Sequence, residues 1–132
     1  MLQVKEDRII LRAPHGMWVV EPYGKNTVRC RVTRNTRISD EKWTLLDVPQ
    51  ARCTWQQEEN KVTFVNSDLS VTVENCAPYF PGRVSIYRKD RCILTTRQEG
   101  DAANMFLHTE GDHYRTIISF ESNPDEHFYG LG

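Results

Sequence analysis

Short runs in which apolar and polar residues alternate constrain the fold of this 132-residue chain more than any other feature. Leu69, Val71 and Val73 alternate with polar residues, which places them on one face of an extended strand, because successive side chains in a strand point to opposite faces. Almost no stretch has the period of about 3.6 residues that an amphipathic helix requires. The sequence therefore predicts an all-β protein whose strands bury one face and expose the other to water.

Runs of this type follow one another at short intervals and are separated by residues that favour turns, such as Gly, Asn, Asp and Pro. The expected strands are Arg8–Arg12, Met17–Glu21, Thr27–Thr33, 51–55, 62–64, 69–74, Val84–Tyr87, Cys92–Thr95, Met105–His108 and Tyr114–Phe120, with a final strand beginning near His127. Short strands at this spacing predict an antiparallel β-sandwich. The length of the chain corresponds to a single domain over residues 1–132 with one core.

Two connections are expected to be more than tight turns. The segment 34–49 is the longest, and Ser39-Asp40-Glu41-Lys42 within it is expected to form the one helical turn of the chain. The segment 75–82 contains two prolines and two aromatic residues. This composition favours a crossing from one sheet to the other.

The charges of the chain exclude several classes of partner. Seventeen basic and eighteen acidic residues give a formal net charge of −1, and they form no block of one sign. Nucleic acids and anionic membranes attract clusters of Lys and Arg, so neither is expected as a partner. No apolar run approaches the roughly 18 residues of a membrane-spanning helix, and residues 1–7 lack the apolar centre of a secretory signal.

The four cysteines are far apart in the sequence, at Cys30, Cys53, Cys76 and Cys92. Without a C-x-x-C pair they suggest neither a zinc site nor a redox site. Cys30 lies between Val28 and Val32 in an alternating run, so it is expected to be a small core residue. A domain of this size does not need disulfides, which favours a reducing compartment such as the cytoplasm.

The last seven residues, Glu126-His127-Phe128-Tyr129-Gly130-Leu131-Gly132, are the most specific stretch. Glycines that permit unusual backbone angles contribute nothing to a frayed chain end, so this stretch is expected to lie against something that a longer polypeptide supplies. Together with Asp125, it resembles the D-E-x-F-Y-G-L-G signature in the amino-terminal β-domain of glycoside hydrolase family 31, the α-glucosidase and α-xylosidase family.

The resemblance extends more weakly along most of the chain. Thr27 to Val32, followed by Trp43, is similar to the family's V-R-V-R-V strand and the Trp after it. Lys61 to Glu74 resembles its paired V-x-F and L-x-V-x-V strands, and Val84 to Thr95 resembles a hairpin that ends in an I-L pair. The resemblance implies a galactose-mutarotase-like β-sandwich that packs on a catalytic (β/α)8 barrel. Family members continue past the final Gly with a Glu and further strands, so we expect a truncated domain.

No catalytic role is carried over by the resemblance, because the family's two catalytic Asp residues lie on the barrel and no stretch here matches their motifs. A retaining glycosidase holds two carboxyl groups about 5 Å apart. Neighbours on a strand point to opposite faces, so Glu58-Glu59 and Asp125-Glu126 are interpreted as solvated turn charges. The ligand types gathered between His108 and His113 are interpreted as an ordinary polar turn rather than a cation site. We predict no catalytic residue, no metal and no cofactor.

Two sets of residues are candidates for contacts with other molecules. The interdomain contact is expected to use Glu126, Phe128, Tyr129, Gly130 and Gly132. A purely internal strand and turn is the alternative for this stretch. Tyr79 and Phe80, which lie between two prolines, are the aromatic pair expected to stack on a sugar ring, with core packing as the alternative.

The predicted function is that of a non-catalytic amino-terminal domain of a retaining α-glycoside hydrolase of the α-glucosidase type. Its partners would be the catalytic barrel of the same polypeptide and, through it, the carbohydrate substrate, whose entrance the domain would help to shape. A free-standing carbohydrate-binding sandwich and a structural domain without a ligand are the alternatives. A sandwich separated from its partner exposes strand edges, which predicts dimerisation or strand exchange.

Overall fold

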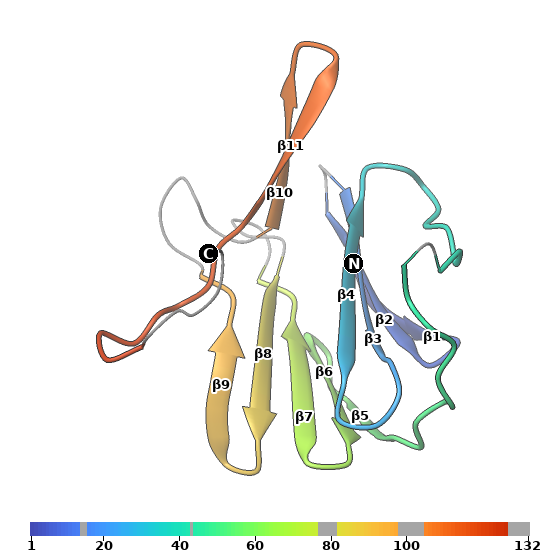
Figure 1. Ribbon diagram of the computed structural model, residues 1–132, viewed down its shortest axis with the longest axis vertical. Coiled ribbons are helices and arrows are strands. Elements are labelled where there is room, and N and C mark those ends of the chain that lie inside the picture. Colours follow the sequence, from blue (N-terminus) through green and yellow to red (C-terminus); the bar gives the residue numbers. More distant parts are fainter. Residues whose placement is uncertain (14–15, 43, 77–81, 98–104, 127–132) are drawn as a thin grey trace.

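The computed structural model describes residues 1–13, 16–42, 44–76, 82–97 and 105–126 of the chain (Figure 1). The strands in these ranges are β1 (Leu2–Lys5), β2 (Arg8–Ala13), β3 (Gly16–Pro22), β4 (Val28–Thr33), β5 (Thr54–Gln57), β6 (Lys61–Asn66), β7 (Leu69–Glu74), β8 (Arg83–Arg88), β9 (Arg91–Thr95), β10 (Met105–Glu110) and β11 (His113–Ile118). The described residues contain no helix, and so none that could cross a membrane. The all-β prediction is confirmed.

The strands form two antiparallel sheets and a separate hairpin. The first sheet has the order β1-β2-β3-β4, and the second has the order β5-β6-β7-β8-β9. Every strand in these sheets pairs with its neighbours in the sequence, so each sheet is a meander, and the two lie one over the other (Figure 1). The hairpin of β10 and β11 extends beyond the end of the two layers (Figure 1).

The core lies between the two sheets and is formed by the residues that the alternation places inward. Its buried members are Ile9, Leu11, Trp18 and Val20 from the first sheet, and Val62, Phe64, Leu69, Val71, Val73, Val84 and Ile86 from the second. The Phe64 side chain is fully buried, and its ring centroid lies 5.0 Å from that of Trp55 at a tilt of 40°. Burial of this apolar surface is the main force that holds the layers together.

One buried polar side chain joins the two sheets. Asn66, at the end of β6, donates hydrogen bonds from Nδ2 to the carbonyl oxygen of Gly24, at 2.8 Å, and to that of Thr27, at 2.9 Å. Both acceptors belong to the turn between β3 and β4. A buried amide must find partners of this kind, so Asn66 fixes the position of one sheet against the other.

Strand β1 was not expected, and its turn explains why. The β1–β2 hairpin turns at Glu6 and Asp7, whose φ angles are 53° and 55°. Hairpin turns with two positive φ angles are usually marked by Asn-Gly or Asp-Gly. Glu-Asp carries no such signal, so residues 1–7 gave no indication of a hairpin.

Two predicted connections are wrong. Ser39-Asp40-Glu41-Lys42 has no regular secondary structure and forms no helical turn. The segment 75–82 does not cross between sheets, because β7 and β8 are neighbours in the same sheet, from Leu69 opposite Arg88 to Glu74 opposite Arg83. The crossing is made between β4 and β5, by the long segment that begins at residue 34.

Strand β4 keeps the predicted orientation, with Val28 and Val32 packed against the core, but the exposure of three other residues differs from the prediction. Cys30, predicted to be a core residue, is exposed. Arg29 and Arg31, predicted to face water, retain only 19% and 11% of their side-chain exposure. The reason is that β4 is an edge strand, which leaves Cys30 beside an open side, while the segment after β4 returns over the arginines.

Candidate functional site

Most of the predicted interdomain residues lie outside the described part of the chain. Phe128, Tyr129, Gly130 and Gly132 belong to this group, and so do the predicted sugar-stacking residues Tyr79 and Phe80. Glu126 is described and exposed. The candidate site is therefore built from the segment that leads to Glu126 and from the strand beside it.

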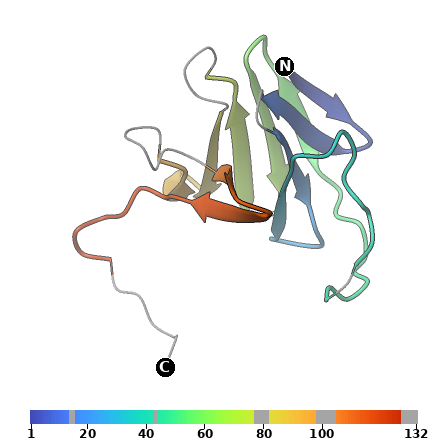
Figure 2. The same ribbon diagram turned by 90° about the horizontal axis from the view of Figure 1, so that it is seen from above.

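That segment begins by pairing with the edge of the second sheet. Phe120 lies opposite Thr96 in an antiparallel bridge. The backbone N–H of Arg97 donates to the carbonyl oxygen of Ser119 at 3.0 Å, and the N–H of Glu121 donates to that of Thr95 at 2.9 Å. After Glu121 the chain leaves β9, and both views show it running out from the sandwich on the β9 side (Figures 1 and 2).

The divergence opens a groove of about 960 Å³ between β9 and the segment 121–126. Asn123 holds the turn in its far wall, because its side-chain oxygen accepts from the N–H of Asp125 at 3.1 Å and its carbonyl oxygen accepts from the N–H of Glu126 at 2.9 Å. Ser122 donates from Oγ to Oε2 of Glu126 at 3.0 Å. Glu121, Asp125 and Glu126 thus make this wall acidic.

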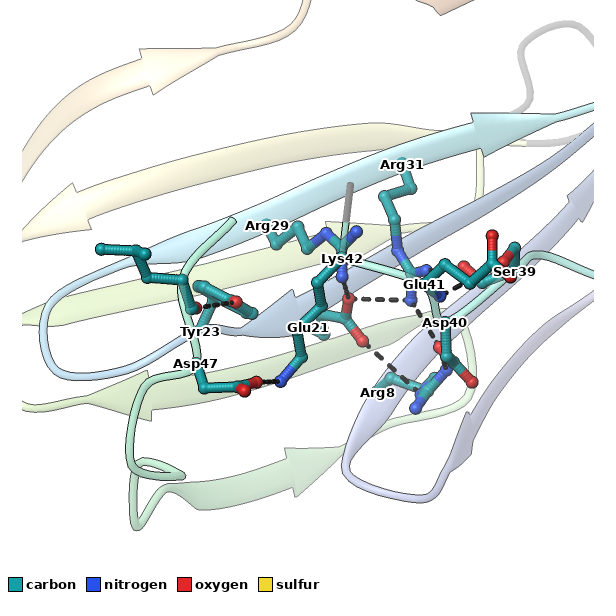
Figure 3. A network of polar contacts seen from close by, with 11 residues as sticks. Arg8, Glu21, Tyr23, Arg29, Arg31, Ser39, Asp40, Glu41, Lys42 and Asp47 are labelled. Carbon is teal, nitrogen blue, oxygen red and sulfur yellow. Dashed lines mark hydrogen bonds and ion pairs between the residues drawn. The ribbon is translucent and has the colours of Figure 1, made fainter. Parts of the chain in front are cut away.

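A second polar site, which the sequence analysis missed, lies on the outer face of the first sheet (Figure 3). Its centre is Glu21 on β3, which is 8% exposed. Arg31 Nη2 lies 2.8 Å from Glu21 Oε1, Arg29 Nη1 lies 3.6 Å from the same oxygen, and Arg8 Nε lies 3.6 Å from Oε2. One carboxylate is therefore surrounded by three guanidinium groups, one from β2 and two from β4.

The segments 34–42 and 44–50 lie over this cluster, and together we call them the strap. Asp40 Oδ1 accepts from Arg8 Nη1 at 2.8 Å and lies 3.2 Å from Arg31 Nη2, while Arg31 Nη1 donates to the carbonyl oxygen of Ser39 at 2.6 Å. Further along the strap, the Tyr23 hydroxyl donates to the carbonyl oxygen of Leu46 at 2.6 Å. Lys42 and Asp47 form an ion pair within the strap (Figure 3).

The cluster places two carboxylates around one guanidinium, but its electrostatics do not suit glycoside hydrolysis. The pKa of the Asp40 carboxyl lies below its usual value, first because Arg8 hydrogen-bonds to it and then because Arg31 does. A general acid in a glycosidase requires a carboxyl whose pKa is raised. Both Glu21 and Asp40 are instead paired with arginines, which indicates a structural role.

The two carboxylate pairs that the sequence analysis singled out lie at the surface. Glu58, Glu59, Asp125 and Glu126 are all exposed, as predicted. The residues described contain no group of three or more His, Cys, Asp or Glu side chains that could hold a metal ion. At the β10–β11 turn, His113 is exposed, and its Nε2 lies 3.2 Å from Asp112 Oδ1.

Two meandering antiparallel sheets that pack around a core define the class of this protein as an antiparallel β-sandwich. The profile of the glycosyl hydrolase 31 N-terminal galactose mutarotase-like domain matches residues 17–132, and the chain belongs to this family. The family resemblance and the fold predicted from the sequence are both confirmed.

A solved structure with the same fold supports this assignment. The crystal structure of a GH31 α-xylosidase from a soil metagenome, complexed with xylose, superposes with a TM-score of 0.79 over 95% of this chain, at 19% sequence identity. This chain spans 21% of the length of that α-xylosidase chain. Among curated proteins, none matches the sequence.

Proposed function

We propose that this chain is the non-catalytic N-terminal domain of a retaining α-glycoside hydrolase of the α-glucosidase type. In this role it packs on a catalytic (β/α)8 barrel and helps to shape the barrel's substrate entrance. The observation that carries the proposal is the family match over residues 17–132. The arginine-neutralised carboxylates of Glu21 and Asp40 support the non-catalytic part of it.

The contact with the barrel is proposed to involve Glu126, Phe128, Tyr129, Gly130 and Gly132. Aromatic rings bury a large area at an interface, and glycines allow a second backbone to come close. Glu126 supports this assignment, because it is exposed at the end of a segment that leaves the sandwich (Figure 2).

The substrate class of the proposed parent enzyme is an α-glycoside. The α-xylosidase that shares this fold was crystallised with xylose, which makes an α-xyloside the competing specificity to an α-glucoside. At 19% identity that likeness concerns the fold alone. The second candidate is a free-standing carbohydrate-binding domain that stacks a sugar on Tyr79 and Phe80. The observation that favours it is that these two aromatic residues lie side by side between two prolines.

Two measurements on the purified chain test the proposal. Incubation with aryl α-glucosides and aryl α-xylosides is expected to release no chromophore, because the residues that the structure describes supply no carboxyl pair suited to the reaction. Release that survives repeated purification would refute the non-catalytic role. Calorimetric titration with gluco- and xylo-oligosaccharides is expected to give no heat of binding, whereas saturable binding lost in Tyr79→Ala would favour the carbohydrate-binding alternative.

In the complete enzyme, the interdomain role predicts that Phe128→Ala and Tyr129→Ala lower the thermal stability of the barrel and raise the KM for substrate. Val65→Ala is the matched control, because Val65 is 40% exposed on the second sheet and belongs to none of the proposed contacts. Unchanged barrel stability in both aromatic variants would count against the interdomain contact.

A further inference from the structure

Among the residues that the structure describes, none pairs with the outer edge of β9 over most of its length. β9 is the last strand of the second sheet, and the segment 119–121 meets it only from Thr95 onward. Within the described ranges, no strand lies beside Arg91–Leu94 on this side. An unpaired edge of this kind is a template for an added strand.

The groove along this edge is apolar in the middle and charged at its ends. Ile93 has no Cα partner on β8, because the register shifts between Leu94 and Cys92, and it is 48% exposed. Arg91 begins the strand, and Glu121 lies beside Thr95 at the other end. Neither of these two charged side chains takes part in an ion pair with another described residue.

This arrangement is complementary to itself. If a second β9 enters the groove antiparallel to the first, a two-fold axis passes near Ile93, and the two Ile93 side chains cover each other. The same operation brings Arg91 of each copy to the end of the groove where Glu121 of the other copy lies. In the added copy, the residues that precede Arg91 turn back into that copy's β8. The added chain therefore does not run on into the segment that begins at Glu121 of the first copy. An isologous contact requires such reciprocal pairing.

We propose that the β9 edge is a self-association surface, on which a second copy of this chain adds its own β9 and joins the two five-stranded sheets into one. Charge complementarity favours a second copy as the occupant. The wall of the groove is acidic, and the added β9 begins with the basic residue Arg91. This inference goes beyond the proposed function and does not depend on it.

The edge of β4 is a weaker candidate for the same contact. Its sequence Val28-Arg29-Cys30-Arg31-Val32 is symmetrical, so a two-fold pair of β4 strands would set Arg29 opposite Arg31 of the second copy. Like charges directly opposite one another destabilise a strand pair. Both guanidinium groups are also engaged with Glu21 in their own chain.

Sedimentation equilibrium over a concentration series, under reducing conditions, tests the proposal. The mass of the chain is expected to rise from that of one copy toward that of two. Arg91→Glu is expected to raise the midpoint concentration about tenfold or more, since it sets two carboxylates together at both ends of the contact. Ile93→Lys is expected to leave a monomer, because it places a charge at the two-fold axis.

The double variant Arg91→Glu/Glu121→Arg separates a direct ion pair from a general loss of structure. It is expected to restore the wild-type midpoint, and Arg37→Glu, at an exposed site on the strap, is expected to leave it unchanged. Circular dichroism establishes that each variant is folded. A mass of one copy at all soluble concentrations would overturn the proposal, and so would association that persists in folded Ile93→Lys or that the double variant fails to restore.

Discussion

Arg31 and Glu21 form an ion pair of 2.8 Å in which both side chains are about nine-tenths removed from solvent, at 11% and 10% exposure. They lie on neighbouring strands of the first sheet, and the strap closes over them. The pair belongs to a cluster in which the guanidinium groups outnumber the carboxylates, so the cluster is sensitive to the loss of either carboxylate.

Glu21→Gln is predicted to destabilise the protein by about 3 kcal/mol, because it leaves three largely buried arginines around a neutral side chain. The measurement is the free energy of unfolding from urea titration. Glu59→Gln, at an exposed turn, is the control and is expected to change that free energy by less than about 0.5 kcal/mol. Equal effects of the two substitutions would show that the Glu21 cluster does not contribute to stability.

Asp40 makes the attachment of the strap dependent on pH. Its folded-state pKa is lowered by Arg8 and Arg31, so its contribution is fully present above the unfolded pKa of about 4 and is lost as the pH falls through the folded value. The stability difference between the wild type and Asp40→Asn is therefore expected to be constant near pH 7 and to shrink below about pH 4. A difference that grows on acidification would contradict this sign.

Asn66→Ala is predicted to cost about 2–4 kcal/mol, because the carbonyl oxygens of Gly24 and Thr27 lose a buried donor. Asn66→Asp should be similarly harmful, since a carboxylate cannot donate to a carbonyl. Thermal unfolding monitored by circular dichroism measures both effects. Wild-type stability of Asn66→Asp would show that donation to these carbonyls is dispensable.

Two neighbours on β6 give a direct test of the core. Phe64 is fully buried and Val65 is 40% exposed on the opposite face. Phe64→Ala is predicted to cost about 3–5 kcal/mol through lost burial and the resulting cavity. Val65→Ala is expected to cost less than about 1 kcal/mol. Comparable losses in the two variants would mean that β6 is not oriented as described.

Most of the fold could be predicted from the alternation, because that pattern records directly which face of each strand is buried. The pairing of β6 with β7, and of β10 with β11 through the turn at Gly111, follows from short loops between periodic runs. The β1–β2 hairpin escaped prediction because Glu6 and Asp7 take positive φ angles without a glycine.

The charged cluster was missed for a different reason. By alternation, Arg29 and Arg31 lie on the outer face of their strand. From the sequence, this outer face was predicted to be exposed to water. The register sets Arg29 opposite Glu21, an opposite-charge pair that the sequence would have suggested had the strands been aligned. What alternation cannot reveal is that an irregular strap returns from residue 34 to cover that face, because such a contact is non-local.

The strap limits the ways in which a larger assembly can be built around this domain. The strap covers part of the outer side of the first sheet, since it is tied there through Asp40, Ser39 and Leu46. A neighbour that approaches from that direction meets an ordered ribbon of chain rather than a flat sheet. Substitutions in the ribbon therefore change the surface that a neighbour meets and leave the hydrophobic core between the two sheets unchanged.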